Sequence, residues 1–279
     1  MKTNPTTKRT IFAMFLATVL LAVLPACTKD PQAPVRTYET VEGTLIFTAN
    51  GVSFKMNPVE GGTFTMGTTS EQDSDAWDDE EPTHSVTLSS YYMGETEVTQ
   101  ALWQAVMGSN PSSYTGDSQR PVEDVSWNDC QQFITKLNQL CASQLNGRQF
   151  ALPTEAQWEY AARGGKQSHG YKYSGSNTLG NVAWYTDNSG GTTHAVGAKQ
   201  ANELGLYDMS GNVWEWCQDW YGNYGSTAQT DPTGPFTGSS RVNRGGGWHS
   251  SGGGCRVSLR LNSTPGCPSD DLGLRLSLR

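Results

Sequence analysis

The sequence is poor in the residues that build most zinc and serine-hydrolase sites. Its 279 residues include only four histidines, His84, His169, His194 and His249, with no His-x-His or His-x-x-x-His pair. A zinc ion needs several closely placed ligands, and a serine hydrolase needs a histidine base with an acidic partner. Neither kind of site is indicated.

Positive charge is also scarce. Lys and Arg number 19 against 27 Asp and Glu, which gives a formal net charge of -8. Removal of residues 1–26 would take away the three positive charges of Lys2, Lys8 and Arg9 and leave -11. Because nucleic acid is bound through positively charged surfaces, it is not an expected partner.

The number of cysteines after residue 27 is odd. The cysteines after residue 27 are Cys130, Cys141, Cys217, Cys255 and Cys267. An odd number argues against a complete disulfide framework, although an exported protein could form one or two bridges.

A long hydrophobic run occurs at the N-terminus. Lys8 and Arg9 precede IFAMFLATVLLAVLPA, which is short for a membrane span and typical of a signal peptide. The following Cys27 completes Leu-Pro-Ala-Cys, which resembles a bacterial lipobox whose cysteine is lipidated; an ordinary secretory signal is the alternative. We expect a signal peptide over 1–26, a polar tether over 27–44 and one domain over 45–279.

The domain mixes strand and helix patterns. Residues 45–67 alternate like two short strands joined at Gly61-Gly62, and residues 85–94 read as another strand. Helices are expected over 98–107, ended by Gly108; over 127–143, begun by Ser126 and Asp129; and after Thr154, with Gln157 and a Gly164-Gly165 stop. Residues 166–279 read as short strands and long loops, so the fold class is α+β.

Two residue clusters have competing interpretations. The acidic stretch Asp73 to Glu81 is predicted to be a solvated loop rather than a cation site. Trp214, Trp216 and Trp220 could form a platform for a sugar, but core packing is favoured.

Four groups of motifs resemble the formylglycine-generating enzymes, also called sulfatase-modifying factors. They are VEGGTFTMG (59–67), YYMGETEVTQALWQAVM (91–107), RPVEDVSWNDC with ALPTEAQWEYAARGG (120–130, 151–165), and GLYDMSGNVWEWCQDW with RGGGW and LGLR (205–220, 244–248, 272–275). The resemblance implies a C-type-lectin-like α+β fold that is rich in loops and low in regular secondary structure.

In the enzymes of this family, two cysteines of the last segment bind copper and convert a substrate cysteine into formylglycine. Ser250 stands at the place of the first cysteine, and Cys255 falls outside either position when the shared C-terminal ending is aligned. Cys267 could contribute a thiolate only if the loop folded back. Copper is therefore not expected, and a copper-dependent formylglycine-generating oxidoreductase is the alternative.

The family resemblance also implies two structural calcium sites. The first consists of the Asp208 and Glu215 side chains with the carbonyls of Gly211 and Val213. The second consists of Asn181, the Val182 carbonyl, Asn188 and the Gly190 carbonyl, and it is weaker because Asn188 replaces an aspartate. In the alternative interpretation, Asp208 and Glu215 cap backbone amides.

The final 31 residues contain no Lys, Gln, Glu, Met or Trp, although the chain has 52 of them. These are the types that an Asn codon cannot become when its first two adenines are replaced. This pattern resembles the variable proteins of diversity-generating retroelements. The alternative is that a non-enzymatic relative simply drifted to small polar residues in this loop. Within the segment 249–271, the expected ligand-binding residues are His249, Ser250, Ser251, Gly254, Leu259, Leu261, Asn262, Ser263, Cys267, Ser269, Asp270 and Asp271.

The intervening residues are expected to be a fixed scaffold: Trp248, Cys255, Arg256, Val257, Arg260, Thr264, Pro265, Gly273 and Arg275. The predicted protein is a non-catalytic lipoprotein that presents segment 249–271 to a protein or glycan ligand. It is expected in the bacterial cell envelope, lipid-anchored at the outer membrane. A structural accessory lipoprotein of a cell-envelope machine is a second alternative.

Overall fold

A computed structural model describes residues 1, 38–39 and 43–279, and every described residue from Tyr38 onward belongs to one unit. The expected signal peptide, Cys27 and most of the tether lie outside these residues. In the described part of the chain, no helix is both long and apolar enough to cross a membrane.

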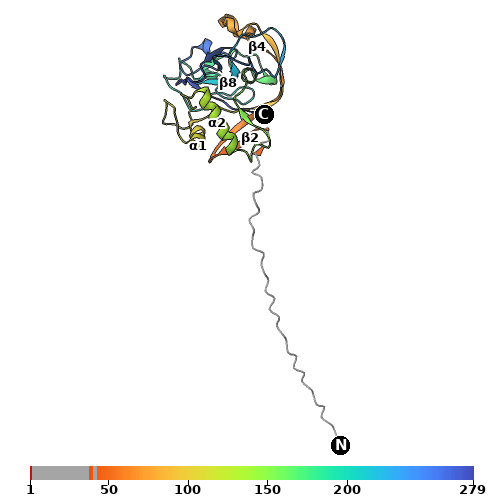
Figure 1. Ribbon diagram of the computed structural model, residues 1–279, viewed down its shortest axis with the longest axis vertical. Helices are drawn as coiled ribbons and strands as arrows, with labels where there is room; N and C mark the ends of the chain where they lie inside the picture. Colours follow the sequence, from red (N-terminus) through yellow and green to blue (C-terminus); the bar gives the residue numbers. More distant parts are fainter. Residues whose placement is uncertain (2–37, 40–42) are drawn as a thin grey trace. The chain divides into compact units, whose positions relative to one another are not determined.

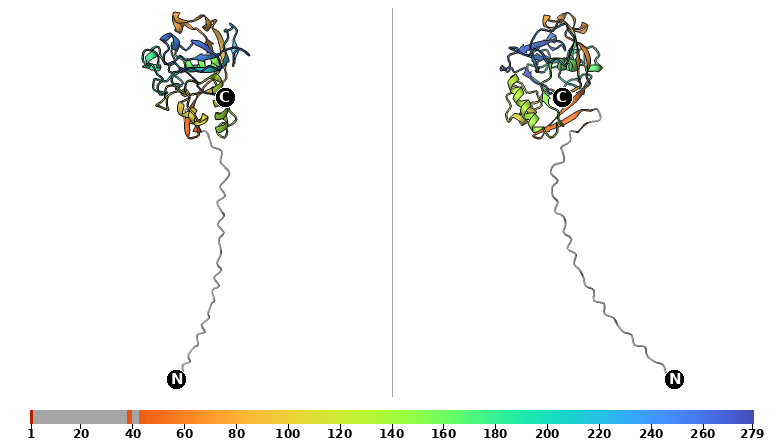
Figure 2. Two further views of the ribbon diagram at one scale, coloured as in Figure 1. Left: turned by 60° about the vertical axis from the view of Figure 1, so that its left-hand side comes forward. Right: turned by 45° about the vertical axis from the view of Figure 1, so that its right-hand side comes forward.

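The largest sheet has six strands and includes the C-terminus. In spatial order they are β1 (Tyr38–Glu39), β2 (Leu45–Ala49), β3 (Val52–Val59), β6 (Tyr91–Gly94), β13 (Ser277–Leu278) and β7 (Phe150–Ala151). Because β13 pairs with β6 on one side and β7 on the other, the chain end is part of the sheet. The views in Figure 1 and Figure 2 show the C-terminus lying against the domain.

The strand prediction for residues 45–67 was right that one strand ends and another begins around Gly61-Gly62, but it missed an earlier turn. β2 and β3 are joined at Asn50-Gly51, both at positive φ, and Gly62 begins a third strand, β4 (Gly62–Met66). Asn-Gly suits the tight hairpin turn that matches strand twist, so it was the stronger signal. The single strand expected over 85–94 is likewise two strands, which belong to different sheets.

Two smaller sheets complete the β structure. The four-stranded sheet has the order β11 (Arg260–Ser263), β10 (Arg241–Arg244), β8 (Trp214–Trp220) and β12 (Leu272–Gly273). The three-stranded sheet has the order β4, β5 (His84–Leu88) and β9 (Gln229–Thr230).

The three predicted helices are present, but the first begins at Gln100 rather than at 98, the second ends at Leu140 rather than at 143, and a short fourth helix was not predicted. They are α1 (Gln100–Met107), α2 (Trp127–Leu140), α3 (Glu155–Ala162) and the short α4 (Leu179–Val182). Ser126 with Asp129, and Thr154 with Gln157, form reciprocal capping boxes. Short 3-10 helices occupy Ser70–Asp75, Asp78–Glu80, Gly165–Gln167 and Gly252–Cys255.

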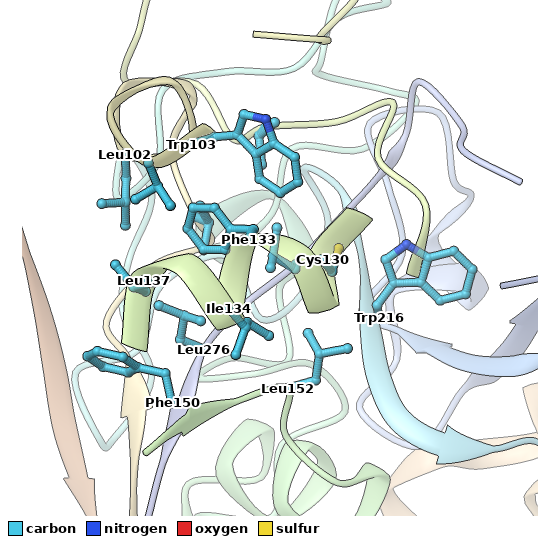
Figure 3. Packing of buried hydrophobic residues seen from close by; sticks show 14 of the residues in the cluster. Leu102, Trp103, Cys130, Phe133, Ile134, Leu137, Phe150, Leu152, Trp216 and Leu276 are labelled. Carbon is cyan, nitrogen blue, oxygen red and sulfur yellow. The ribbon is translucent and has the colours of Figure 1, made fainter. Parts of the chain in front are cut away.

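The main core joins α1 and α2 to the six-stranded sheet and to β8. Trp103 stacks on Phe133 with ring centroids 4.9 Å apart, and the apolar face of α2 points toward Phe150 and Leu276 (Figure 3). Trp216 is fully buried and donates a hydrogen bond from Nε1 to the Val125 carbonyl at 3.0 Å. The packing interpretation of Trp216 is therefore confirmed.

Candidate ligand-binding face

Four buried arginines, three within the last 35 residues and one directly before them, anchor the C-terminal part of the domain. Their closest ion pairs are Arg244 with Glu159 at 2.5 Å, Arg256 with Glu80 at 2.5 Å, Arg260 with Glu155 at 2.7 Å and Arg275 with Glu215 at 2.7 Å. Each arginine is at most 1% exposed. Removing one member of such a pair would leave an uncompensated buried charge, so this framework tolerates little change.

The prediction that the whole acidic stretch is solvated was wrong at Glu80. This carboxylate is fully buried and accepts hydrogen bonds from Arg256 and from the Ser258 hydroxyl. Burial raises the pKa of Glu80, but the hydrogen bonds from Arg256 and Ser258 outweigh burial and hold the pKa below its usual value. The partners lie far along the chain, so the local charge run could not reveal them.

A hollow of about 610 Å³ opens between the acidic stretch and the C-terminal segment. The residues that line it are Ala76, Trp77, Trp214, Ser250, Ser251, Gly253, Gly254, Leu259 and Leu261. Five of these, Ser250, Ser251, Gly254, Leu259 and Leu261, are predicted ligand-binding residues. Aromatic and aliphatic walls with small polar groups are typical of binding pockets.

Sequence reasoning missed Trp77, an exposed aromatic residue in the wall of the hollow. Its side chain is 53% exposed, and its backbone N–H donates to Glu80 Oε1 at 3.0 Å. The buried Glu80 thus fixes the backbone from which Trp77 projects. The available signal was a tryptophan within an acidic run.

A second group of predicted residues adjoins the hollow. The His249 ring lies 3.5 Å from the Asp271 carboxylate, and the Ser269 hydroxyl donates to that carboxylate. Asp270 is exposed, and its carbonyl accepts a hydrogen bond from Trp248 Nε1 at 3.2 Å. The Asp271 carbonyl in turn accepts from the backbone N–H of Trp214, whose side chain lines the hollow.

The remaining predicted residues are not all presented on this face. Asn262 is exposed but lies on the opposite side of β11 from Leu261, because successive strand residues point to opposite faces. Ser263 accepts a hydrogen bond from Asn243, and Cys267 is exposed in a turn after β11.

Two predicted contact residues, Leu259 and Asp271, are buried. They are 1% and 8% exposed. Leu259 forms part of the wall of the hollow and Asp271 lies behind it, which corrects the expectation that both residues project toward a ligand.

The first expected calcium site lies in a buried acidic cluster. Asp208 Oδ2 accepts from the Gly197 N–H at 2.7 Å, and its Oδ1 is buried without a partner among the described residues. Burial, together with the nearby charge of Glu215, raises the pKa of Asp208 to about 6. Burial and the charge of Asp208 also raise the pKa of Glu97. The cluster therefore contains three carboxylates, those of Asp208, Glu215 and Glu97, and the one guanidinium of Arg275.

The orphaned Asp208 oxygen and the excess negative charge fit a bound cation. Glu215 is less available, because both its oxygens accept from Arg275 and one also accepts from Trp158 Nε1 at 2.6 Å. Within the described chain, no three His, Cys, Asp or Glu side chains are placed to hold a metal by themselves. An ion here would therefore depend on the Gly211 and Val213 carbonyls.

The residues of the second expected calcium site make local hydrogen bonds. The Asn188 side chain accepts from the Tyr185 N–H and donates to the Ala183 carbonyl, and the Asn181 carbonyl accepts from the Gln200 N–H. Val182 is buried and Gly190 is exposed. This second site stays a prediction without an orphaned group to support it.

Comparison with known proteins decides the family. The family profile described as the sulfatase-modifying factor enzyme 1-like domain matches residues 49–279. The chain belongs to this family.

Two relatives within the sulfatase-modifying factor family illustrate its range. Chaperone protein LppX of Paenibacillus barcinonensis is 34% identical over 265 residues, covering 78% of this chain and 87% of the relative. The formylglycine-generating enzyme of Streptomyces coelicolor is 35% identical over 196 residues, covering 64% of this chain and 58% of the enzyme.

Solved structures confirm the loop-rich α+β fold of the family. Treponema denticola variable protein 1 matches with a TM-score of 0.75 and 37% identity, covering 84% of this chain and 98% of that protein. PvdO from Pseudomonas aeruginosa matches with a TM-score of 0.69 and 23% identity, covering 81% and 94%, which concerns the fold alone.

Within this family context, Cys255 has the surroundings of a buried apolar residue. It is fully buried and packs with Leu179, Val182 and Ala183. Burial raises the pKa of its thiol to about 12, which disfavours the thiolate that would bind a metal. All five cysteines that the structure describes are free thiols.

Proposed function

We propose that this protein is a non-catalytic lipoprotein, lipid-anchored through Cys27 in the bacterial cell envelope at the outer membrane, that presents the face around the hollow to a protein or glycan ligand. The observation that carries the proposal is the division of the C-terminal segment into two sets of residues. Buried arginines hold the scaffold, whereas Ser250, Ser251 and Leu261 line an open hollow with Trp77. Exposed positions on a fixed scaffold tolerate substitution at little cost in stability.

We further propose that the face is diversified by a retroelement. Support comes from the missing residue types in the last 31 positions and from the likeness to a Treponema variable protein. Sequencing the surrounding genome is the direct test. A neighbouring reverse-transcriptase gene and an imperfect repeat of the segment's coding DNA are expected; an ordinary locus with neither would refute diversification.

Binding through the hollow can be tested on the full-length chain in neutral detergent, with a glycan array and a displayed peptide library as probes. Ser251 is exposed, and its side chain makes no capping hydrogen bond, so Ser251→Trp would fill the hollow without removing a bond of the fold. Asn262→Trp, on the other side of β11, is the matched control. Probes that bind the native chain should no longer bind Ser251→Trp but should still bind the control. Equal binding of these probes by both variants would contradict the proposal.

The enzyme alternative predicts a different result. If the protein were a formylglycine-generating oxidoreductase, the reduced chain would bind cuprous ion tightly and consume the thiol of a sulfatase-motif peptide. We expect neither, because the Cys255 thiol is buried and Ser250 carries no sulfur. Copper-dependent loss of the peptide thiol would overturn the non-catalytic assignment.

We propose a structural calcium ion at the first site, held by Asp208 with the carbonyls of Gly211 and Val213. The ion would supply positive charge to a turn that has no regular hydrogen-bond ladder. The support is the orphaned Asp208 oxygen within a cluster of carboxylates.

A further inference from the structure

A separate cavity of about 410 Å³ lies where α3 begins, and we call it the α3 cavity. Its walls come from the ends of β4, β5 and β8, from the first turn of α3, from Arg260 and from the segment 222–235, which includes β9. The residues are Met66, His84, Glu155, Ala156, Asp219, Trp220, Gly222, Asn223, Tyr224, Gly225, Gln229, Asp231, Pro232, Thr233, Gly234, Pro235 and Arg260. None of these residues lines the hollow.

The side chain of Asp219 is the unusual polar group of this cavity. It is only 4% exposed, and its Oδ2 accepts from the Glu155 N–H at 3.0 Å. Its Oδ1 accepts no hydrogen bond from a described residue and is not fully buried, so it stays accessible within the cavity. A Cβ atom added to Gly234, another lining residue, would lie 3.1 Å from this oxygen. A carboxylate oxygen that has no protein donor and faces a cavity can accept a hydrogen bond from a bound cation.

The other charged groups of the α3 cavity are already paired. Arg260 donates to both oxygens of Glu155 and to the carbonyls of Asp79 and Gly222. The Asp231 carboxylate accepts from the backbone and hydroxyl of Ser89.

The nearby cation Arg241 is also engaged. Its guanidinium lies 3.5 Å from the ring centroid of Trp220 and 4.0 Å from that of Trp127, and it donates to the Gln218 carbonyl. Among the described residues, no cationic side chain forms an ion pair with Asp219. The lining of the cavity carries three carboxylates, Glu155, Asp219 and Asp231, against the single guanidinium of Arg260.

We propose that the α3 cavity binds a small organic cation, a primary amine or a guanidinium with an apolar body, whose charged end pairs with Asp219 Oδ1. The volume lies in the range of small-molecule sites, and Met66, Trp220, Pro232 and Pro235 offer apolar walls for the body. A charge-assisted hydrogen bond to this accessible oxygen would orient the bound cation. A metal ion fits less well, because the other carboxylates of the wall, Glu155 and Asp231, are already paired.

The first test uses the native full-length chain in neutral detergent and two probes of equal shape. Butylguanidinium and butylurea differ chiefly in charge, and calorimetric titration at pH 9, above the Asp219 pKa of about 8, measures the affinity of each. We expect the cation to bind at least about tenfold more tightly than the neutral probe. Equal affinity, or no binding of either probe, would overturn the proposal without recourse to a variant.

The second test assigns the site. Asp219→Asn keeps the shape but removes the charge, and we expect it to lose the preference for butylguanidinium. Asp270→Asn, an exposed carboxylate beside the hollow, is the matched control and should leave the preference unchanged. An unaltered preference in Asp219→Asn would refute the assignment to this cavity. Trp77→Ala should impair ligand binding at the hollow and leave the guanidinium preference intact, so the two proposals can fail separately.

Discussion

At the scale of single residues, the buried ion pairs of the C-terminal segment are expected to dominate the response to mutation. Glu80 is fully buried against Arg256, whereas its neighbour Glu81 is exposed. Glu80→Gln should lower the free energy of unfolding by about 3–5 kcal/mol, because the Arg256 charge stays buried without its partner. Urea denaturation of this variant and of the control Glu81→Gln measures the difference, and equal stability of the two would contradict the ion-pair framework.

Asp219 predicts a dependence of stability on pH. Burial and the neighbouring charge of Glu155 raise its pKa to about 8. Because the unfolded chain releases this proton near pH 4 and the folded chain near pH 8, the Asp219 contribution to stability falls as the pH rises between these values. Asp219→Asn should therefore lose less stability than the native chain between pH 5 and pH 8.5.

The urea midpoints of the two proteins at both pH values measure this effect. Asp270→Asn serves as a control that should follow the native profile. Parallel profiles for the native chain and Asp219→Asn would show that Asp219 is not the responsible group.

At the scale of elements, the turn 208–215 is the place where a cation is expected to matter. Chelation by EDTA should lower the melting temperature of the native chain, because the carboxylates of Asp208 and Glu97 would then face each other without the ion. Asp208→Asn should abolish this response. Asp187→Asn, an exposed carboxylate in another turn, should retain it.

Differential scanning calorimetry with calcium and with EDTA measures both variants. An EDTA-insensitive melting temperature of the native chain would argue against the structural calcium site.

The two-residue strand β13 is expected to contribute strongly to the stability of the domain. Leu278 is fully buried and pairs with Tyr92 on one side and Phe150 on the other, whereas Leu140 at the end of α2 is exposed. Leu278→Ala should cost about 2–5 kcal/mol of unfolding free energy, because it opens a cavity between the paired strands. Leu140→Ala is the matched control in a denaturation experiment; a similar loss in both would mean that β13 does not close the core.

At the scale of the whole molecule, anchoring through Cys27 gives a further prediction. Lipidation of Cys27 should retain the protein in the membrane fraction, and Cys27→Ala should shift it to the soluble or uncleaved form. Fractionation with metabolic labelling by a fatty acid measures the change. Labelling that persists in Cys27→Ala would place the lipid elsewhere.

The sequence predicted local features well where neighbouring residues decide the outcome. The caps at Ser126 and Thr154, the stop at Gly108 and the packing of Trp216 were all foreseen. It missed the hairpin turn at Asn50-Gly51, because the alternating pattern was divided only at Gly61-Gly62.

The candidate face was only partly foreseen. Ser250, Ser251 and Leu261 were found from the composition and spacing of the last segment, and they do line the hollow. Trp77 was missed because no local pattern connects it to residues 170 or more positions away.

The sequence by itself determined the family, the loop-rich α+β fold and the capping residues of α2 and α3, because each depends on short motifs. Tertiary structure alone decided that Glu80 pairs with Arg256 across 176 residues, that Trp77 projects beside the hollow and that Asp219 is buried with a free oxygen. These features depend on which distant segments pack against each other and exclude water. Burial determines the charge and the partners of a side chain only after the chain has packed.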